Sequence, residues 1–183
     1  MLRRPFRARR GVIELRLDDE QATVLLGLVA ELRDLIDDPA AAGHDVAARL
    51  QPAVFPEDPL AELEYREMTG DDLTRQRQGA ADVVENAIRD GAESGAGVRT
   101  EIAPDDVEAW LISLNYLRLA LGTALGIAED TQVPSDFEET GGEDDDAISA
   151  QAQRHSVYMW LSYLLELLVD ESSGLLLSDS SDA

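Results

Sequence analysis

The sequence of 183 residues contains no cysteine, and all 15 of its basic residues are arginine, so lysine is absent as well. Without cysteine the chain has no disulfide, no thiolate nucleophile, no iron–sulfur cluster and no cysteine-based zinc site. Without lysine it cannot form a phosphate-binding P-loop, which requires that side chain. Histidine is also scarce, because His44 and His155 are the only two, and their spacing excludes a zinc motif on one helix.

Long apolar runs are missing too. The longest apolar stretches are short and interrupted by charges, so the sequence predicts no transmembrane helix. A secretory signal peptide needs an apolar segment after its basic residues. The basic residues at the start of this chain are not followed by one, so we predict no signal peptide. We therefore expect a protein of the bacterial cytoplasm.

Acidic residues are abundant, with 38 of them against 15 arginines and a formal net charge of -23. The charge is unevenly distributed. Residues 1–16 hold six arginines and one acid, a net of +5, and the rest of the chain holds nine arginines and 37 acids, a net of −28. So acidic a body repels phosphate backbones, and we expect it not to bind nucleic acid. A GC-rich coding sequence and a salt-rich habitat both remain open as causes of this composition.

Hydrophobic periodicity predicts a mainly α-helical protein, a compact bundle of about five helices with a small N-terminal antiparallel β-hairpin. Residues 12–17 alternate between apolar and polar, which is the period of a strand, and Arg10-Gly11 favours a tight turn before them. Asp18 and Gln21 have the spacing of a capping box at the start of a helix. Residues 98–102 are a candidate for a third short strand.

The same patterns divide the single predicted domain, residues 1–183, into consecutive segments. They are a basic hairpin (1–17), a helical core (18–127), an acidic flexible linker (128–146), a C-terminal core helix (147–171) and a mobile tail (172–183). The tail is expected to start where Ser172-Ser173-Gly174 ends the helix.

One core helix is expected to open with Asp58 as its cap and Pro59 in its first turn. We expect Thr69-Gly70 to interrupt this helix, and its apolar side chains to face inward. Those side chains are Leu60, Leu63 and Met68.

No chemical motif stands out against its structural alternative. Residues 136–147 match the first positions of a calcium-binding loop, but Ala147 occupies the twelfth position, where a carboxylate is required. The helices around Thr69-Gly70 could form a helix-turn-helix, but residues 57–72 carry seven acids and one arginine, so a plain helical hairpin is favoured. We predict no catalytic, cofactor-binding or metal-binding residue, and no enzymatic activity.

The N-terminal arginines are the one candidate contact site. Arginine suits two-pronged contacts to carboxylates or phosphates. These arginines would either pair with acids of the same molecule or of a second copy, which we favour, or contact an acidic partner or a nucleic acid. The candidate residues are Arg3, Arg4, Arg7, Arg9, Arg10 and Arg16.

Three groups of residues, together with the basic hairpin, carry a family resemblance. The first is the run 55–59 with 64–66 and 71–73, the second is spread over 108–127, and the third is Tyr158 with Trp160-Leu161. They resemble an actinobacterial family of unknown function, number two-thousand-seventeen in the series of such domains, over nearly the whole chain.

The resemblance implies a regulatory protein. Some members are described as actinomycete oxidative-stress regulators that act through a partner sigma factor, and family genes often lie beside that of the Clp protease adaptor ClpS. A sigma factor or a Clp-system component is therefore the implied partner. A thiol–disulfide switch cannot operate in this chain, because it has no cysteine. Met68 and Met159 are oxidisable, but we expect both on core faces.

We therefore predict a non-enzymatic regulatory or protein-interaction protein, with the arginine-rich hairpin as a charged contact. The alternatives are an adaptor or regulator of Clp proteolysis, a metal-dependent carboxylate hydrolase, and a DNA-binding regulator that uses the hairpin. The identity of the partner, the signal and the formation of homo-oligomers are left open by the sequence.

Overall fold

The computed structural model describes residues 4–93, 97–127 and 145–179. Within these ranges the chain forms five α-helices, two short 3-10 helices and one four-stranded antiparallel sheet, which confirms the predicted fold class. In chain order the elements are β1 (Phe6–Arg9), β2 (Val12–Leu17), α1 (Asp19–Asp37), η1 (Pro39–Ala42), α2 (His44–Leu50), α3 (Pro59–Asp90), β3 (Ala92–Glu93), β4 (Gly97–Ile102), η2 (Pro104–Asp106), α4 (Val107–Ala124) and α5 (Asp145–Asp179).

The sheet has the strand order β1-β2-β4-β3, so the strand expected at 98–102 lies beside the hairpin. Phe6 pairs with Leu15 across β1 and β2, and Ile13 pairs with Ile102 across β2 and β4. The hairpin turn is made by Arg10 and Gly11, with φ angles of 52° and 82°. Two consecutive left-handed residues match the twist of paired strands, so the turn predicted at Arg10-Gly11 is confirmed.

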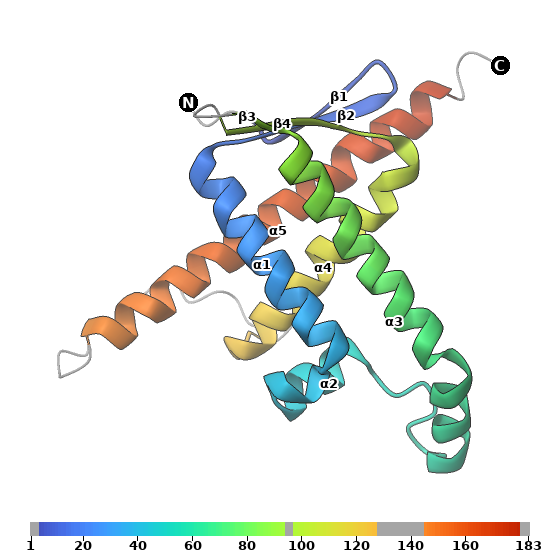
Figure 1. The fold of residues 1–183 in the computed structure, drawn as a ribbon. Helices are drawn as coiled ribbons and strands as arrows, with labels where there is room; N and C mark the ends of the chain where they lie inside the picture. Colours follow the sequence, from blue (N-terminus) through green and yellow to red (C-terminus); the bar gives the residue numbers. More distant parts are fainter. Residues whose placement is uncertain (1–3, 94–96, 128–144, 180–183) are drawn as a thin grey trace.

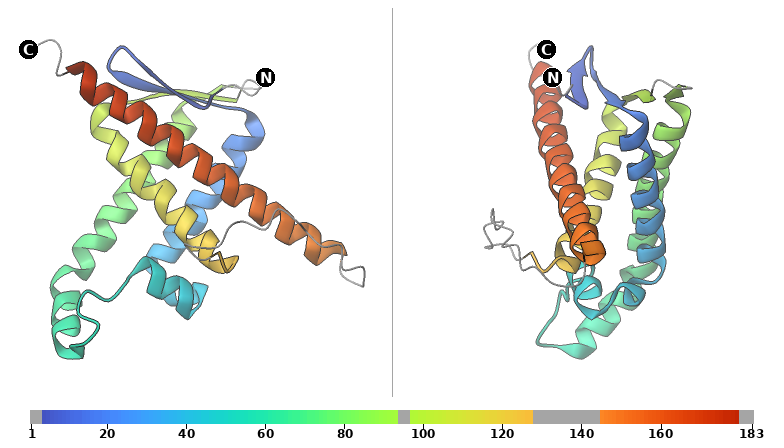
Figure 2. Two further views of the ribbon diagram at one scale, coloured as in Figure 1. Left: turned by 180° about the vertical axis from the view of Figure 1, so that it is seen from behind. Right: turned by 90° about the vertical axis from the view of Figure 1, so that its left-hand side faces the viewer.

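The helices form layers beneath the sheet, which covers one end of the bundle (Figure 1). Helix α4 lies between α5 on one side and the pair α1 and α3 on the other (Figure 2), and it contacts α3 and α5. Phe6 and Trp110 are fully buried and meet edge to face, with ring centroids 6.0 Å apart. The hairpin is therefore part of the core, because its strands supply buried side chains such as Phe6 and Ile13.

The helix starts agree with the sequence. The Asp18 carboxylate accepts from the Gln21 backbone N–H at 2.8 Å, and the Gln21 side chain accepts from the Asp18 N–H at 3.1 Å, which confirms the capping box. Asp58 caps α3 by accepting from the N–H groups of residues 60 and 61, both at 3.1 Å. Both helices therefore begin where the capping residues predict.

Helix α3 continues without interruption from Pro59 to Asp90, so the break predicted at Thr69-Gly70 is wrong. The Thr69 hydroxyl donates to the Tyr65 carbonyl oxygen at 2.8 Å, which satisfies this polar group inside the helix. A glycine costs a helix only about 1 kcal/mol relative to alanine, too little to end it. The continuous helix excludes both the helix-turn-helix and the helical hairpin at this position.

The first half of α3 projects beyond the other helices, away from the sheet (Figure 1). Leu60, Leu63 and Met68 are 66%, 54% and 74% exposed, so the expectation that they face inward is wrong. Periodicity marks one face of a helix as apolar, but it does not supply a neighbour for that face. We call residues 52–73 the arm; none of them is buried.

Helix α5 begins at Asp145 and continues to Asp179, so the helix end predicted at Ser172-Ser173-Gly174 is wrong. Both serine hydroxyls donate to the Val169 carbonyl oxygen at 2.9 Å and so stay within the helical backbone. Residues 172–179 of the predicted mobile tail are helical, whereas residues 180–183 and the linker residues 128–144 lie outside the described ranges. Every helix in those ranges is too short or too polar to cross a bilayer.

Candidate interaction site

Five of the six predicted arginine contacts are in the described ranges; they lie on the strands and turn of the hairpin or just before it, and three of them are paired within the molecule. Arg4 lies 3.5 Å from Glu171 of α5. Arg9 and Arg16 both bind Glu14, at 3.3 Å and 3.0 Å. For these three arginines the structure shows the pairing with acids of the same molecule that we favoured.

Arg7 and Arg10 are different, because both are exposed and neither makes an ion pair with the residues that the structure describes. Arg3 lies outside the described ranges. Among the five described arginines of the hairpin, the unpaired positive charge thus lies at Arg7 and Arg10.

Glu14 is the centre of charge on the hairpin. Partial desolvation raises the pKa of its carboxyl group, but the hydrogen bonds and positive charges of Arg16 and Arg9 more than offset this, and the pKa lies below its ordinary value of 4.5. Glu14 therefore stays ionised at neutral pH and holds two arginines on the outer surface of the sheet.

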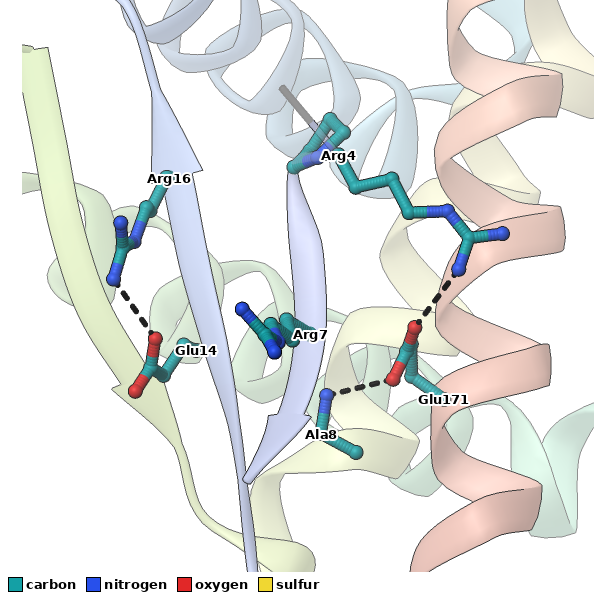
Figure 3. A pocket seen from close by; sticks show the side chains of 7 residues that line it. Arg4, Arg7, Ala8, Glu14, Arg16 and Glu171 are labelled. Carbon is teal, nitrogen blue, oxygen red and sulfur yellow. Dashed lines mark hydrogen bonds and ion pairs between the residues drawn. The ribbon is translucent and has the colours of Figure 1, made fainter.

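Glu171 covers the exposed edge of the sheet. Its carboxylate accepts from the backbone N–H of Ala8 at 2.7 Å and lies beside Arg4 (Figure 3). A free N–H of an edge strand otherwise offers a pairing site to another chain. Between β1 and α5 this leaves a pocket of about 520 Å³, which Arg7 also lines. Five of its seven lining residues are charged, and its two acids, Glu14 and Glu171, are already paired.

A second surface, which the sequence did not predict, lies on the arm. The side chains three and four positions apart on the first half of α3 share one exposed face, here called the outer face. It combines large apolar side chains with acids that form no ion pair in the described part of the chain. The outer face consists of Leu60, Leu63, Glu64, Glu67, Met68 and Asp71.

The opposite side of the arm is held by Glu62. Its carboxylate accepts from the backbone N–H groups of Phe55 and Val54 at 2.9 Å and 2.8 Å, and from Arg66 at 2.5 Å. The hydrogen bond from Phe55, followed by that from Arg66, lowers the pKa of Glu62 below its ordinary value of 4.5 despite partial desolvation. The ionised carboxylate therefore fixes the loop before α3 against the helix.

Aromatic and arginine contacts reinforce this attachment. The rings of Phe55 and Tyr65 meet edge to face with centroids 5.9 Å apart. Arg66 also donates to the Gln51 carbonyl oxygen at 3.2 Å. The arm is thus a helix and a loop that stabilise each other, and the outer face is the side of the helix that is turned away from the loop.

The two histidines lie on α2 and α5. His44 begins α2, and His155 is half-buried with its ring centroid 6.3 Å from that of Tyr158. No group of three or more metal-binding side chains occurs among the described residues. Met68 and Met159 are 74% and 48% exposed, so their expected position on core faces is wrong.

Sequence reasoning missed the outer face because its residues have the same helical spacing as a core face. A signal was present, since acids stand between the apolar residues on that face instead of on the opposite one.

The fold and these surfaces define a mainly helical protein with a hairpin cap and two charged surface sites. The chain belongs to the family DUF2017, a domain of unknown function, which it matches over residues 3–172. No curated protein and no solved structure matches it.

Proposed function

We propose that this protein is a non-enzymatic regulatory protein that acts by binding a partner protein through the outer face of the arm. The observation that carries the proposal is the exposure of Leu60, Leu63 and Met68, at 66%, 54% and 74%, on one face of a helix. Contiguous exposed apolar side chains are typical of interaction sites, because leaving them in water without a partner is unfavourable.

The charges of the outer face indicate which kind of partner surface would fit it. Glu64, Glu67 and Asp71 stand among the apolar side chains and have no arginine partner in the described ranges. A complementary surface therefore combines an apolar groove with lysine or arginine side chains, and such charges also accelerate association. Leucine and methionine side chains adapt well to a groove of this kind.

The family resemblance makes a sigma factor the first partner to test. If binding is regulated in this chain, the regulation does not use a thiol–disulfide switch, since the chain has no cysteine. Arg7 and Arg10 are exposed on the hairpin and would supply a second, basic contact for an acidic part of the partner.

The test replaces the apolar side chains of the outer face by glutamine, a good helix former of similar size. The variant is Leu60→Gln with Leu63→Gln and Met68→Gln, and the matched control is Met159→Gln, which changes a 48% exposed methionine on α5. Partners are captured from a native lysate and quantified by mass spectrometry, and purified sigma factors are titrated directly. We expect the triple variant to lose about a hundredfold in affinity or more and the control to lose little.

Equal capture and equal affinity for the triple variant and the wild type would remove the outer face from the proposal. The hairpin contact needs a separate test by substitution. Deleting residues 1–16 would take Phe6, Ile13 and Leu15 out of the core and unfold the protein. Arg7→Gln with Arg10→Gln keeps these buried side chains, and an unchanged affinity of this variant would exclude the hairpin as a contact.

A further inference from the structure

A pocket of about 560 Å³ lies behind the arm, between its inner side, the end of α2 and the middle of α4. Pockets of this size bind small molecules. Six of its fourteen lining residues are apolar or aromatic. This part of the lining consists of Leu50, Pro52, Val54, Tyr65, Leu73 and Tyr116.

Arg77 of α3 is the unusual member of the lining. The other three arginines of this helix each have an acidic partner three or four positions earlier, as expected for ion pairs on a helix surface. These pairs are Arg66–Glu62, Arg75–Asp72 and Arg89–Glu85. Arg77 has no acid at the corresponding positions on either side, where the sequence places Leu73, Thr74, Ala80 and Ala81.

The surroundings of Arg77 do not supply an acid from elsewhere in the described chain. Arg77 is half-buried, and its guanidinium carbon lies 4.9 Å from the centroid of the Tyr116 ring. No carboxylate lies within ion-pair distance of it among the described residues. Stacking on an aromatic ring stabilises one face of a guanidinium and leaves its in-plane N–H groups available for a carboxylate.

The other charged groups of the pocket are already bonded. Glu62 and Arg66 bind each other and the neighbouring backbone. Asp71 is exposed at the rim, where water screens its charge. The Thr74 hydroxyl lies one turn before Arg77, lines the same pocket and has no hydrogen-bond partner among the described residues. Arg77 is therefore the cation of the lining that has no acidic partner among the described residues, and the Thr74 hydroxyl lies one turn away from it.

We propose that this pocket binds a small organic carboxylate, whose charged group pairs with Arg77 and Thr74 and whose apolar body lies against Tyr65, Tyr116 and Leu50. One unpaired cation matches one negative charge. A phosphate dianion would leave a second charge uncompensated beside Glu62. The inference goes beyond partner binding by the outer face and does not depend on it, because the apolar side chains of the outer face do not line the pocket and the two sites share only Asp71.

The position of the pocket implies that a bound ligand would stabilise the arm. Tyr65 belongs to the arm, and Tyr116 belongs to α4, which is anchored in the core. A ligand that contacts both rings links the arm to the rest of the molecule and reduces its local unfolding. The pocket is thus a place where a metabolite of this class would act on the arm.

The test uses para-trifluoromethylbenzoate and its neutral analogue para-trifluoromethylbenzamide, titrated into the full chain and followed by fluorine NMR. The proteins are the wild type, Arg77→Gln and the matched control Arg75→Gln, which removes an arginine that is 74% exposed on the same helix. We expect the benzoate to saturate the wild type and the control equally in the low-millimolar range. We expect Arg77→Gln to bind it about tenfold more weakly and the benzamide not to distinguish the three proteins.

Failure of the benzoate to saturate the wild type would overturn the proposal, and so would equal affinities of Arg77→Gln and the wild type. Mapping backbone amide shifts on the wild-type protein gives a readout that does not depend on the folding of a variant. The largest shifts are expected at Tyr65, Thr74 and Tyr116. Shifts concentrated at Arg7 and Ala8 would assign the benzoate to the hairpin pocket and overturn the proposal. Benzoate binding by the triple glutamine variant of the outer face should equal that of the wild type, which separates this test from that of partner binding.

Discussion

The two halves of α3 have the same secondary structure and opposite surroundings. In the second half, Ala81, Val84 and Ile88 are fully buried against the neighbouring helices and β4. In the first half, Leu60, Leu63 and Met68 are more than half exposed. Helical spacing of apolar residues therefore determines that a helix forms and which face is apolar, whereas burial depends on what lies opposite that face.

Polar contacts differ between the two halves in the same way. In the second half, Glu85 and Asp82 both bind Arg33 of α1, so their contacts join two helices that are distant in sequence. In the arm, Glu62 binds Arg66 and the loop just before the helix. Contacts of the second half join helices that are distant in sequence, whereas these polar contacts of the arm reach only its own residues and Gln51 just before it. This places the arm among the segments that open most easily.

The largest expected difference comes from equivalent truncations in the two halves. Ile88→Ala removes a fully buried side chain and should lower the free energy of unfolding by about 2–5 kcal/mol. Leu63→Ala shortens a side chain that is 54% exposed and should change it by less than about 0.5 kcal/mol. Urea unfolding followed by circular dichroism measures both. A loss of stability in Leu63→Ala as large as that in Ile88→Ala would mean that the outer face is packed in solution.

Elements that local chemistry specifies were predictable from the sequence. The hairpin follows from alternation over residues 12–17 and from Gly11, and the starts of α1 and α3 follow from Asp18 and Asp58. The helix end predicted at Ser172-Ser173-Gly174 is wrong, because serine hydroxyls that donate to a carbonyl oxygen of the same helix do not break it. A residue that weakens a helix locally does not end a long helix, because its cost is small compared with the stability of the other turns.

The candidate sites were less predictable than the elements, because they depend on contacts between distant residues. The sequence predicts the six N-terminal arginines as contact residues, but it does not show that Arg4 pairs with Glu171, because these two residues lie near opposite ends of the chain. The stacking of Arg77 on Tyr116 likewise joins two helices. The absence of an acid three or four positions from Arg77 was visible in the sequence, but it becomes informative only once the pocket is known.

Two glycines extend the comparison to the backbone. Gly97 has a φ of +80°, and a Cβ there would collide with the Leu17 carbonyl oxygen, so Gly97→Ala should lower the free energy of unfolding by about 1–3 kcal/mol. Gly70 lies within α3 with nothing within 4 Å of a Cβ, so Gly70→Ala should raise it by up to about 1 kcal/mol. In thermal unfolding, Gly97→Ala should lower the midpoint temperature and Gly70→Ala should raise it. A destabilising Gly70→Ala would indicate that the arm needs a flexible point at this position.

The smallest expected effect is a local one that depends on pH. Because the folded-state pKa of Glu62 lies below its unfolded value of 4.5, its stabilising contribution is complete above that pH and is lost as the pH falls through the lowered folded-state pKa. Protonation removes the charge that holds the N–H groups of Val54 and Phe55. Hydrogen-exchange protection factors should therefore fall in residues 51–66 under acid conditions while Ile88 remains protected.

Glu62→Gln should show the weakened protection of the arm already at neutral pH and should remove its pH dependence, because the amide keeps an acceptor oxygen but carries no charge. The matched control is Glu64→Gln, two positions along on the outer face, whose carboxylate has no bonding partner among the described residues. It should leave the wild-type pH profile of residues 51–66 unchanged. Equal profiles for Glu62→Gln and the wild type would show that the loop is held by the contact of Phe55 with Tyr65 and not by the carboxylate.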